Sequence, residues 1–323
     1  MTGTGQDLIR LSLAAAQTQA TCLDAQDLAW MSCLVQMNRL EQLSPEQRGQ
    51  SLCRALMAPY PRGFFEALRA CGGLKRFLPE LDLLFSQALP DSGTAAAAPN
   101  AGEVQLRVLG RLAASGAPLE QRLAGLLHRI GWAPPAGGQW GYRRLLARPG
   151  ALAQTALAAL CERMDLPRAQ LQLCRQLMQH RDPLLHLADG EPEAVLQLLL
   201  ALGLPQHVHP PGQPRQPAPL TTLLHLCQLE HEAATGRAGA RFVQARWWQR
   251  MQAAVAAVPA PAAQPGERLN ALSGAGSGAR PDPAWNPAWH PAWHQAQLAC
   301  LRQLLLHELP VQAQHPPPGP PRR

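Results

Sequence analysis

The chain of 323 residues is 46% hydrophobic and 16% charged, so it has enough apolar sequence for one large core or two smaller ones. No stretch approaches the roughly 18 uninterrupted apolar residues of a membrane span, and the N-terminus lacks the features of a signal peptide. The net charge of +7 comes almost entirely from arginine, because Lys75 is the only lysine. This composition suits contact with phosphate groups, and it equally fits a gene from a GC-rich genome.

Eight cysteines are spread along the chain without a CxxC pair. Most of them lie among Leu and Ala, as buried thiols do. This usage predicts a reducing, cytoplasmic location.

Helix-forming residues dominate the sequence. Leu, Ala, Gln and Arg are common, whereas there are only five Phe and two Tyr. Apolar residues recur at three- and four-residue spacing in 28–43 and in 194–203, which is typical of amphipathic helices. The predicted fold class is therefore all-α.

Two helix boundaries can be placed from capping residues. Ser44 is an N-cap candidate, with Pro45 at the first helical position and Glu46 in the first turn. The Gly72–Gly73 pair is expected to end the short helix that precedes it, because glycine readily adopts the left-handed conformation of a C-cap.

Stretches rich in Pro, Gly and small residues separate the helical parts. We expect loops or disordered linkers at 90–102, 205–219 and 259–283. The tandem repeat PAWNPAWHPAWH follows, and a short C-terminal helix is predicted over 295–309. The tryptophans of the repeat are either a platform for stacking bases or part of a linker that packs on the body: Trp285, Trp289 and Trp293.

Several motifs taken together resemble one family, the bacterial tRNA nucleotidyltransferases or CCA-adding enzymes that carry a C-terminal HD phosphohydrolase domain. The stretch 43–85 looks like that enzyme's neck helices, with the Phe64–Phe65 pair, the RACGGL turn and the LPELDLLF end in the same order. Shorter stretches are similar to parts of the HD body: 111–131, 160–167 and 235–242.

The resemblance implies a division of the chain into three parts. A neck-like helical region spans 1–89, a degenerate HD-like helical body spans 90–258, and a Pro/Gly/Trp-rich linker with the C-terminal helix and tail spans 259–323. The family's nucleotidyltransferase head would precede the matching region, and its Gly-rich turn and paired Asp residues do not occur in this sequence. CCA addition by this chain alone is therefore not expected.

The resemblance also places a vestigial HD site at His128, where Arg129 replaces the Asp of the doublet. A hard divalent cation needs anionic oxygen ligands, and unit charges about 4 Å apart interact by about 4 kcal/mol at an effective dielectric near 20. Replacing attraction by repulsion is thus expected to abolish the site. The family's earlier His falls at or near Val104, and His180 and His186 remain only weak metal candidates because their spacing is too long.

These substitutions lead to two expectations for the HD position. We predict that no metal or other cofactor is bound, and that Arg129 forms an internal ion pair or reaches solvent, because an unpaired buried guanidinium would cost several kcal/mol. His128 lies on an apolar helix with no carboxylate partner in view, so it is expected to be a core residue. A role as a lone acid–base residue is the alternative.

Basic residues form three groups that would contact RNA if the neck and body lie against tRNA, as they do in the family. The candidates are Arg48, Arg54, Arg62, Arg69, Lys75 and Arg76 in the neck-like region, then Arg143, Arg144 and Arg148, then Arg246 and Arg250. Tryptophans beside the last two groups would stack bases. The same pattern also fits a solvated face with Trp247 or Trp248 as a core anchor.

The sequence thus predicts a non-catalytic, head-less relative of the CCA-adding enzyme that binds tRNA or other structured RNA, or assists another RNA-processing protein. One alternative is a residual phosphohydrolase with rearranged ligands such as His128, His180 and His186. Another is a helical adaptor that docks proteins through the Trp repeat and the Pro-rich tail. No membrane partner is expected.

Overall fold

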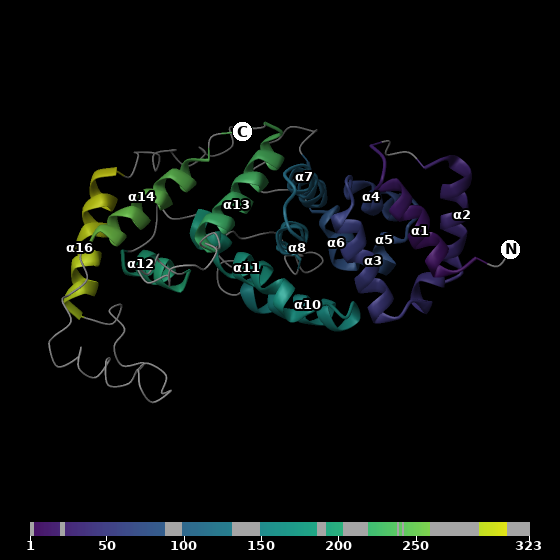
Figure 1. The fold of residues 1–323 in the computed structure, drawn as a ribbon, viewed down its shortest axis with the longest axis horizontal. Coiled ribbons are helices and arrows are strands. Elements are labelled where there is room, and N and C mark those ends of the chain that lie inside the picture. The colour runs from purple at the N-terminus through teal and green to yellow at the C-terminus, as the bar shows by residue number, and fades with distance from the viewer. Residues whose placement is uncertain are drawn as a thin grey trace, which may run out of the picture. The chain divides into compact units, whose positions relative to one another are not determined.

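The computed structural model describes residues 3–19, 23–87, 99–130, 149–185, 192–202, 219–237, 239–240, 242–258 and 291–308. All elements assigned in these ranges are helices, so the predicted all-α fold class is confirmed (Figure 1). The chain divides into two compact units: unit 1 comprises Met1–Asp182 and Leu223–Phe242, and unit 2 comprises Pro183–Thr222 and Val243–Arg323. The predicted linkers lie almost entirely outside the described residues, as do Trp285 and Trp289.

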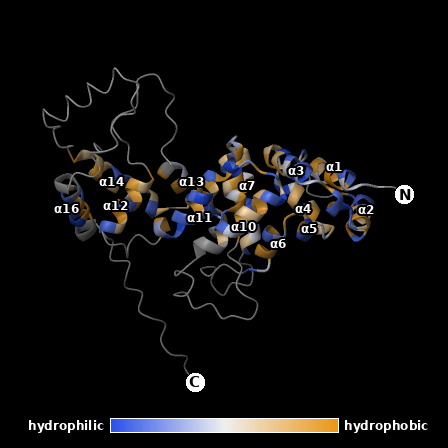
Figure 2. Ribbon diagram, turned by 90° about the horizontal axis from the view of Figure 1, so that it is seen from below, coloured by the Kyte–Doolittle hydropathy of each residue, from blue (hydrophilic) through white to orange (hydrophobic). Residues whose placement is uncertain are grey.

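Unit 1 contains most of the helices. In chain order they are α1 (Gly5–Ala15), α2 (Ala25–Gln36), the 3-10 helix η1 (Arg39–Gln42), α3 (Pro45–Met57), α4 (Arg62–Ala70), α5 (Leu74–Phe77), α6 (Pro79–Leu84), α7 (Ala101–Ala114), α8 (Leu119–Leu127), α10 (Pro149–Arg163), the 3-10 helix η2 (Arg168–Leu171), and the larger parts of α11 (Gln172–Leu185) and α13 (Pro219–Thr235). Each helix of unit 1 that is labelled in Figure 2 carries both hydrophobic and hydrophilic residues, as expected for helices with one buried face.

The two predicted helix boundaries are confirmed. Ser44 caps α3: its hydroxyl accepts a hydrogen bond from the Gln47 N–H, and the Gln47 side chain accepts one from the Ser44 N–H. Gly72 adopts a φ of +75°, and the N–H of Gly73 donates to the carbonyl oxygen of Leu68 over 2.7 Å. This left-handed turn ends α4 and starts α5.

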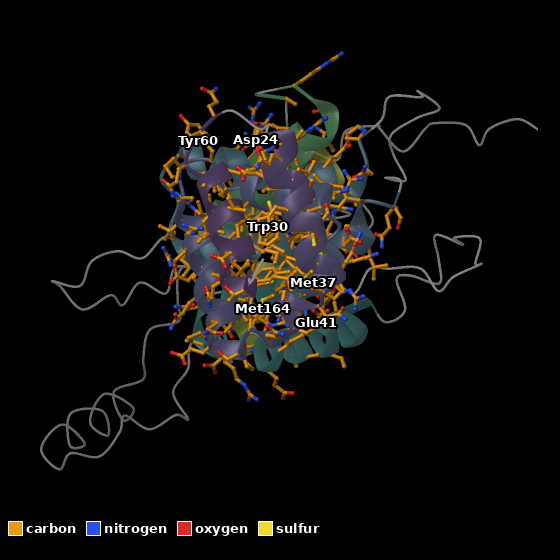
Figure 3. The ribbon with its side chains drawn as sticks, turned by 90° about the vertical axis from the view of Figure 1, so that its right-hand side faces the viewer. Asp24, Trp30, Met37, Glu41, Tyr60 and Met164 are labelled. Carbon is orange, nitrogen blue, oxygen red and sulfur yellow. The ribbon has the colours of Figure 1, made fainter. Side chains whose placement is uncertain are left out.

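Three phenylalanines form the centre of the core around α4. Phe64 is in edge-to-face contact with Phe65 and Phe77, with ring centroids 5.2 and 5.6 Å apart, and all three are fully buried. Helix α4 approaches α1 closely because residue 63 is a glycine: a Cβ there would lie 2.2 Å from the carbonyl oxygen of Ala15. Figure 3 shows the end of this unit that carries α1 and α2, with Trp30 near its centre.

Unit 2 contains α12 (Pro192–Ala201), α14 (Val243–Ala257) and α16 (Pro291–Glu308), with α16 packed against the other two. The predicted C-terminal helix therefore begins earlier than expected, inside the Trp repeat. Its Arg302 forms an exposed ion pair with Glu193 of α12 over 2.6 Å. Within the ranges given above, we find no helix with the length and apolar character needed to cross a membrane.

Candidate functional site

Three helical segments of unit 1 meet at the buried carboxylate of Glu230 on α13. Arg129, which follows α8, donates from Nε to Oε1 of Glu230, and Arg181 of α11 donates from Nε to Oε2 over 2.7 Å. The side chains of Glu230, Arg129 and Arg181 are only 5%, 12% and 10% exposed. Both carboxylate oxygens therefore carry a guanidinium hydrogen bond in a place with little access for water.

The charges of this Glu230 cluster balance one another. Burial alone would raise the pKa of the Glu230 carboxyl, but the guanidiniums of Arg129 and Arg181, together with His128, hold this pKa well below its usual range. Burial likewise lowers the pKa of Arg181, and the carboxylates of Glu230 and Asp182 more than offset it, so that this pKa lies above its ordinary value. Asp182 accepts a bond from Arg181 Nη1 over 2.9 Å.

His128 lies in the same cluster. It is 1% exposed, its Nδ1 is 2.9 Å from the carbonyl oxygen of Ala124, and its Nε2 is 3.3 Å from Oε1 of Glu230. The Nε2 contact is an electrostatic approach without the direction of a hydrogen bond. The expectation of a core histidine is confirmed. The sequence around His128 shows no carboxylate partner, because Glu230 comes from a distant part of the chain.

These residues do not fit a divalent metal ion. A cation would need the Glu230 oxygens that two guanidiniums already bind, and Arg129 and Arg181 would repel it. No three His, Cys, Asp or Glu side chains gather as a metal site in the part of the chain that the structure describes. The predicted internal ion pair of Arg129 is confirmed. Its partner carried no local signal, because the two residues are 101 positions apart.

The other predicted metal positions are placed only in part. Val104 is fully buried on α7. His180 is half-buried on α11, where burial lowers its pKa. His186 lies outside the described residues, so the geometry of the predicted His180–His186 pair stays a prediction.

The predicted RNA contacts beyond the neck-like region have different outcomes. One group lies outside the described residues: Arg143, Arg144 and Arg148. Arg246 and Arg250 are both exposed on α14. Trp248 between them is fully buried, and its Nε1 donates to the carbonyl oxygen of Leu184 over 2.9 Å. The alternative that Trp248 anchors α14 in the core is thus confirmed.

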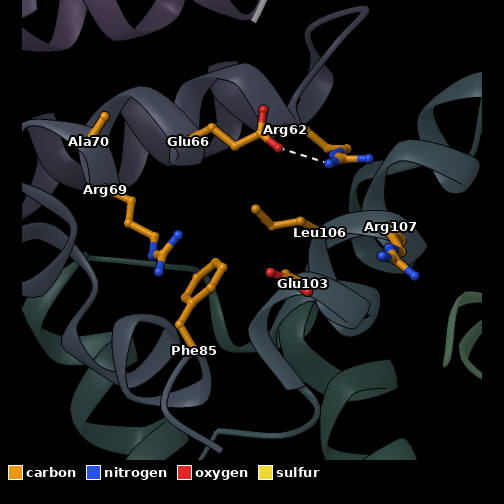
Figure 4. Close-up of a pocket in the computed structure, with 8 residues that line it drawn as sticks. All are labelled: Arg62, Glu66, Arg69, Ala70, Phe85, Glu103, Leu106 and Arg107. Atoms are coloured by element: carbon orange, nitrogen blue, oxygen red, sulfur yellow. Dashed lines mark hydrogen bonds and ion pairs between the residues drawn. The ribbon is translucent and has the colours of Figure 1, made fainter. Parts of the chain in front are cut away.

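Arg62 and Arg69 of the neck-like region line one pocket, which we call the α4–α7 pocket (Figure 4). It has a volume of about 520 Å³ and lies between α4, α7 and the residue that follows α6. Its charged and aromatic lining residues are Arg62, Glu66, Arg69, Phe85, Glu103 and Arg107. The sequence indicated only Arg62 and Arg69 as binding residues. Phe85, Glu103 and Arg107 join them in the pocket through the packing of α6 and α7.

Several other arginines serve internal contacts. Arg48 is 9% exposed and donates to the carbonyl oxygens of Leu43 and Leu40, which does not favour the predicted contact with RNA. Further arginines bond to buried carbonyl groups or form ion pairs within unit 1: Arg122 with Leu56 and Ala58, Arg163 with Glu80, and Arg111 with Glu232. Much of the arginine content therefore joins helices to one another.

Sequence comparisons relate the chain to the multifunctional CCA proteins. It is 30% identical to the one from Alkalilimnicola ehrlichii over 255 residues, which are 78% of this chain and 58% of that protein. For Methylococcus capsulatus the identity is 30% over 72% of this chain and 51% of the relative. For Nitrosococcus oceani it is 30% over 53% and 41%. The resemblance to the CCA-adding enzymes is thus confirmed.

The chain spans about half the length of the curated relatives that it matches. No protein-family profile matches it, and no solved structure matches it either.

Proposed function

We propose that this partial relative of the CCA-adding enzymes binds structured RNA, with tRNA as the foremost target, and that its helical body performs no metal-dependent hydrolysis. The non-catalytic part rests on the Glu230 cluster. The position at which the family resemblance places a metal ligand holds Arg129, which is bonded to a buried carboxylate. The guanidinium is a fixed internal cation that joins α8 to α13, so the helices stay together without a metal ion.

The RNA part rests on the family and on exposed arginines. Since the CCA-adding enzymes act on tRNA, a relative that keeps their neck and body motifs keeps the surface that lies against this ligand. Arg62 and Arg69 are exposed in unit 1, and Arg246 and Arg250 are exposed in unit 2. The planar guanidinium of an exposed arginine matches phosphate geometry. Arg143, Arg144 and Arg148, which lie outside the described residues, are further candidates for contact with RNA.

The two alternatives have weaker support. A hydrolase that uses His128 would need this side chain to reach a substrate, yet it is 1% exposed and faces a carboxylate that two guanidiniums already hold. A protein-docking adaptor depends on the Trp repeat and the Pro-rich tail, which lie almost wholly outside the described residues. An accessory role beside another RNA-processing protein is compatible with RNA binding.

Fluorescence anisotropy with a labelled tRNA transcript and the purified full chain tests this function. At physiological salt we expect tRNA to bind about tenfold more tightly than heparin or a random duplex. The affinity should fall steeply as salt rises, because each arginine–phosphate contact releases counterions. If tRNA binds no more tightly than heparin or the duplex, the proposed RNA-binding function is contradicted, and protein docking becomes the better explanation.

A further inference from the structure

We infer that the α4–α7 pocket takes one ribonucleotide unit of an RNA strand, with the phosphate on Arg69 and a ribose hydroxyl donating to Glu66. The inference rests on the proposed RNA binding, and it adds the place and the chemistry of one contact. The volume of about 520 Å³ lies within the usual range of pockets for small ligands.

Two helix faces supply the charged lining. Arg62, Glu66 and Arg69 recur at helical spacing on α4, so they share one face, and Glu103 and Arg107 do the same on α7. Figure 4 shows Leu106 between these two rows, with Arg69 beside Phe85 on one side and Arg107 on the other. The pocket thus has an apolar floor between charged walls.

Arg69 is held in an orientation that suits a phosphate. Its Cζ lies 4.3 Å from the centroid of the Phe85 ring. The ring in turn lies against Gly102, where a Cβ would come within 2.6 Å of it. Arg69 is exposed and forms no ion pair with a carboxylate within the described residues. A guanidinium that is oriented by a ring and is not bound to a carboxylate keeps its N–H groups for an incoming oxyanion.

Arg107 and Arg62 are less available than Arg69. Arg107 donates from Nη1 to the carbonyl oxygen of Ala233 over 3.1 Å, and Arg62 donates from Nη2 to Oε1 of Glu66 over 2.8 Å. Both still contribute positive charge to the lining. Arg69 is therefore the arginine that we assign to the phosphate.

The carboxylates of the pocket narrow the class of ligand. Three guanidiniums and two carboxylates leave a net formal charge of +1, which is weak for a bare anion. The Oε2 atom of Glu66 is buried and has no hydrogen-bond partner within the described residues. A buried acceptor without a donor is costly, so a ligand that brings a hydroxyl donor next to a phosphate is favoured. The ribose 2′-hydroxyl is such a donor, and it distinguishes RNA from DNA.

Matched variants of the full chain test the phosphate contact. Arg69→Gln should weaken tRNA binding about tenfold and reduce the slope of log affinity against log salt by about one. Arg168→Gln removes one exposed charge from η2, outside the pocket lining and outside the predicted RNA contacts, and should weaken binding less than about threefold. Equal losses in the two variants would overturn the assignment, provided that thermal unfolding shows both variants to be folded.

Short single-stranded RNA and DNA of the same sequence test the hydroxyl contact. We expect the unmodified chain to prefer the RNA and Glu66→Gln to lose most of this preference, because an amide is a poorer acceptor than a carboxylate. An unchanged preference in Glu66→Gln would contradict the hydroxyl contact. If the unmodified chain does not prefer tRNA to heparin, the proposed function itself fails. If it does, while Arg69→Gln behaves like Arg168→Gln, only the pocket assignment fails.

Discussion

Arg129 and Glu230 are 101 residues apart in the chain, and their side chains form an ion pair that is 12% and 5% exposed. The pair lies at the position where the resemblance to HD-type enzymes places a metal ligand. Arg181 binds the second oxygen of the same carboxylate, so that α8, α11 and α13 meet at one buried negative charge. In the function that we propose, the Arg129 guanidinium is a permanent internal cation in the place of an exchangeable metal ion.

Removal of the central carboxylate should destabilise the fold. We expect Glu230→Gln to lower the free energy of unfolding by about 3–5 kcal/mol, because Arg129 and Arg181 both lose their ion pair with this buried carboxylate. Denaturant unfolding followed by circular dichroism measures this loss. The control is Glu41→Gln, which breaks an exposed ion pair with Arg76 and should cost less than about 1 kcal/mol. Similar losses would show that the Glu230 cluster contributes no more than a surface pair.

The same carboxylate should make stability depend on pH. The pKa of Glu230 is lower in the folded chain than in the unfolded chain, so unfolding takes up a proton in acid. Its contribution is complete above the unfolded pKa of about 4.3, and it is lost as the pH falls towards the depressed folded value. Below about pH 5, stability should therefore fall less steeply in Glu230→Gln than in the unmodified chain. Parallel curves of unfolding free energy against pH would contradict this.

Restoring the His–Asp doublet at residues 128 and 129 should not restore hydrolase activity. Arg129→Asp is expected to show no metal-dependent hydrolysis, because it places a second carboxylate beside Glu230 while the remaining family ligands are absent. The like charges should also destabilise the fold. Turnover of bis(p-nitrophenyl) phosphate with added manganese measures the activity. Recovery of metal-dependent turnover in this single variant would show that the metal site is more intact than we infer.

Gly63 tests the close approach of α4 to α1. A Cβ at this position would lie 2.2 Å from the backbone oxygen of Ala15, so Gly63→Ala should destabilise the fold by about 1–3 kcal/mol. Gly110→Ala is the control, since its Cβ would meet only the flexible side chain of Arg62, 3.1 Å away. There the helical preference of alanine should leave stability unchanged or raise it by up to about 1 kcal/mol. The same sign of change in both variants would contradict the packing.

Features with local causes could be predicted from the sequence. The cap at Ser44 and the turn at Gly72 depend on residues within a few positions, so the pattern of residue types was sufficient. The start of the last helix was placed too late, because prolines in the repeat suggested a linker and Pro291 instead occupies the first helical position.

Features with distant causes could be predicted only in part. The charge of Arg129 at an apolar helix end required a partner, but the choice of Glu230 depends on how α13 packs. Arg62 and Arg69 were recognised as basic residues on one helix, whereas Phe85 and Arg107 join them only through the packing of α6 and α7. The local periodicity of the sequence does not indicate which residues from distant parts of the chain come into contact.

Measuring the metal content of the purified chain tests most directly whether the Arg129–Glu230 ion pair has replaced a bound metal ion. The purified full chain is equilibrated with excess manganese, passed through a desalting column and measured by elemental analysis, with Glu230→Gln in parallel. We predict only a small fraction of one ion per chain in both proteins, because two guanidiniums hold the carboxylate that a metal would need. About one tightly bound manganese, nickel, iron or zinc ion per unmodified chain, lost in Glu230→Gln, would contradict the replacement.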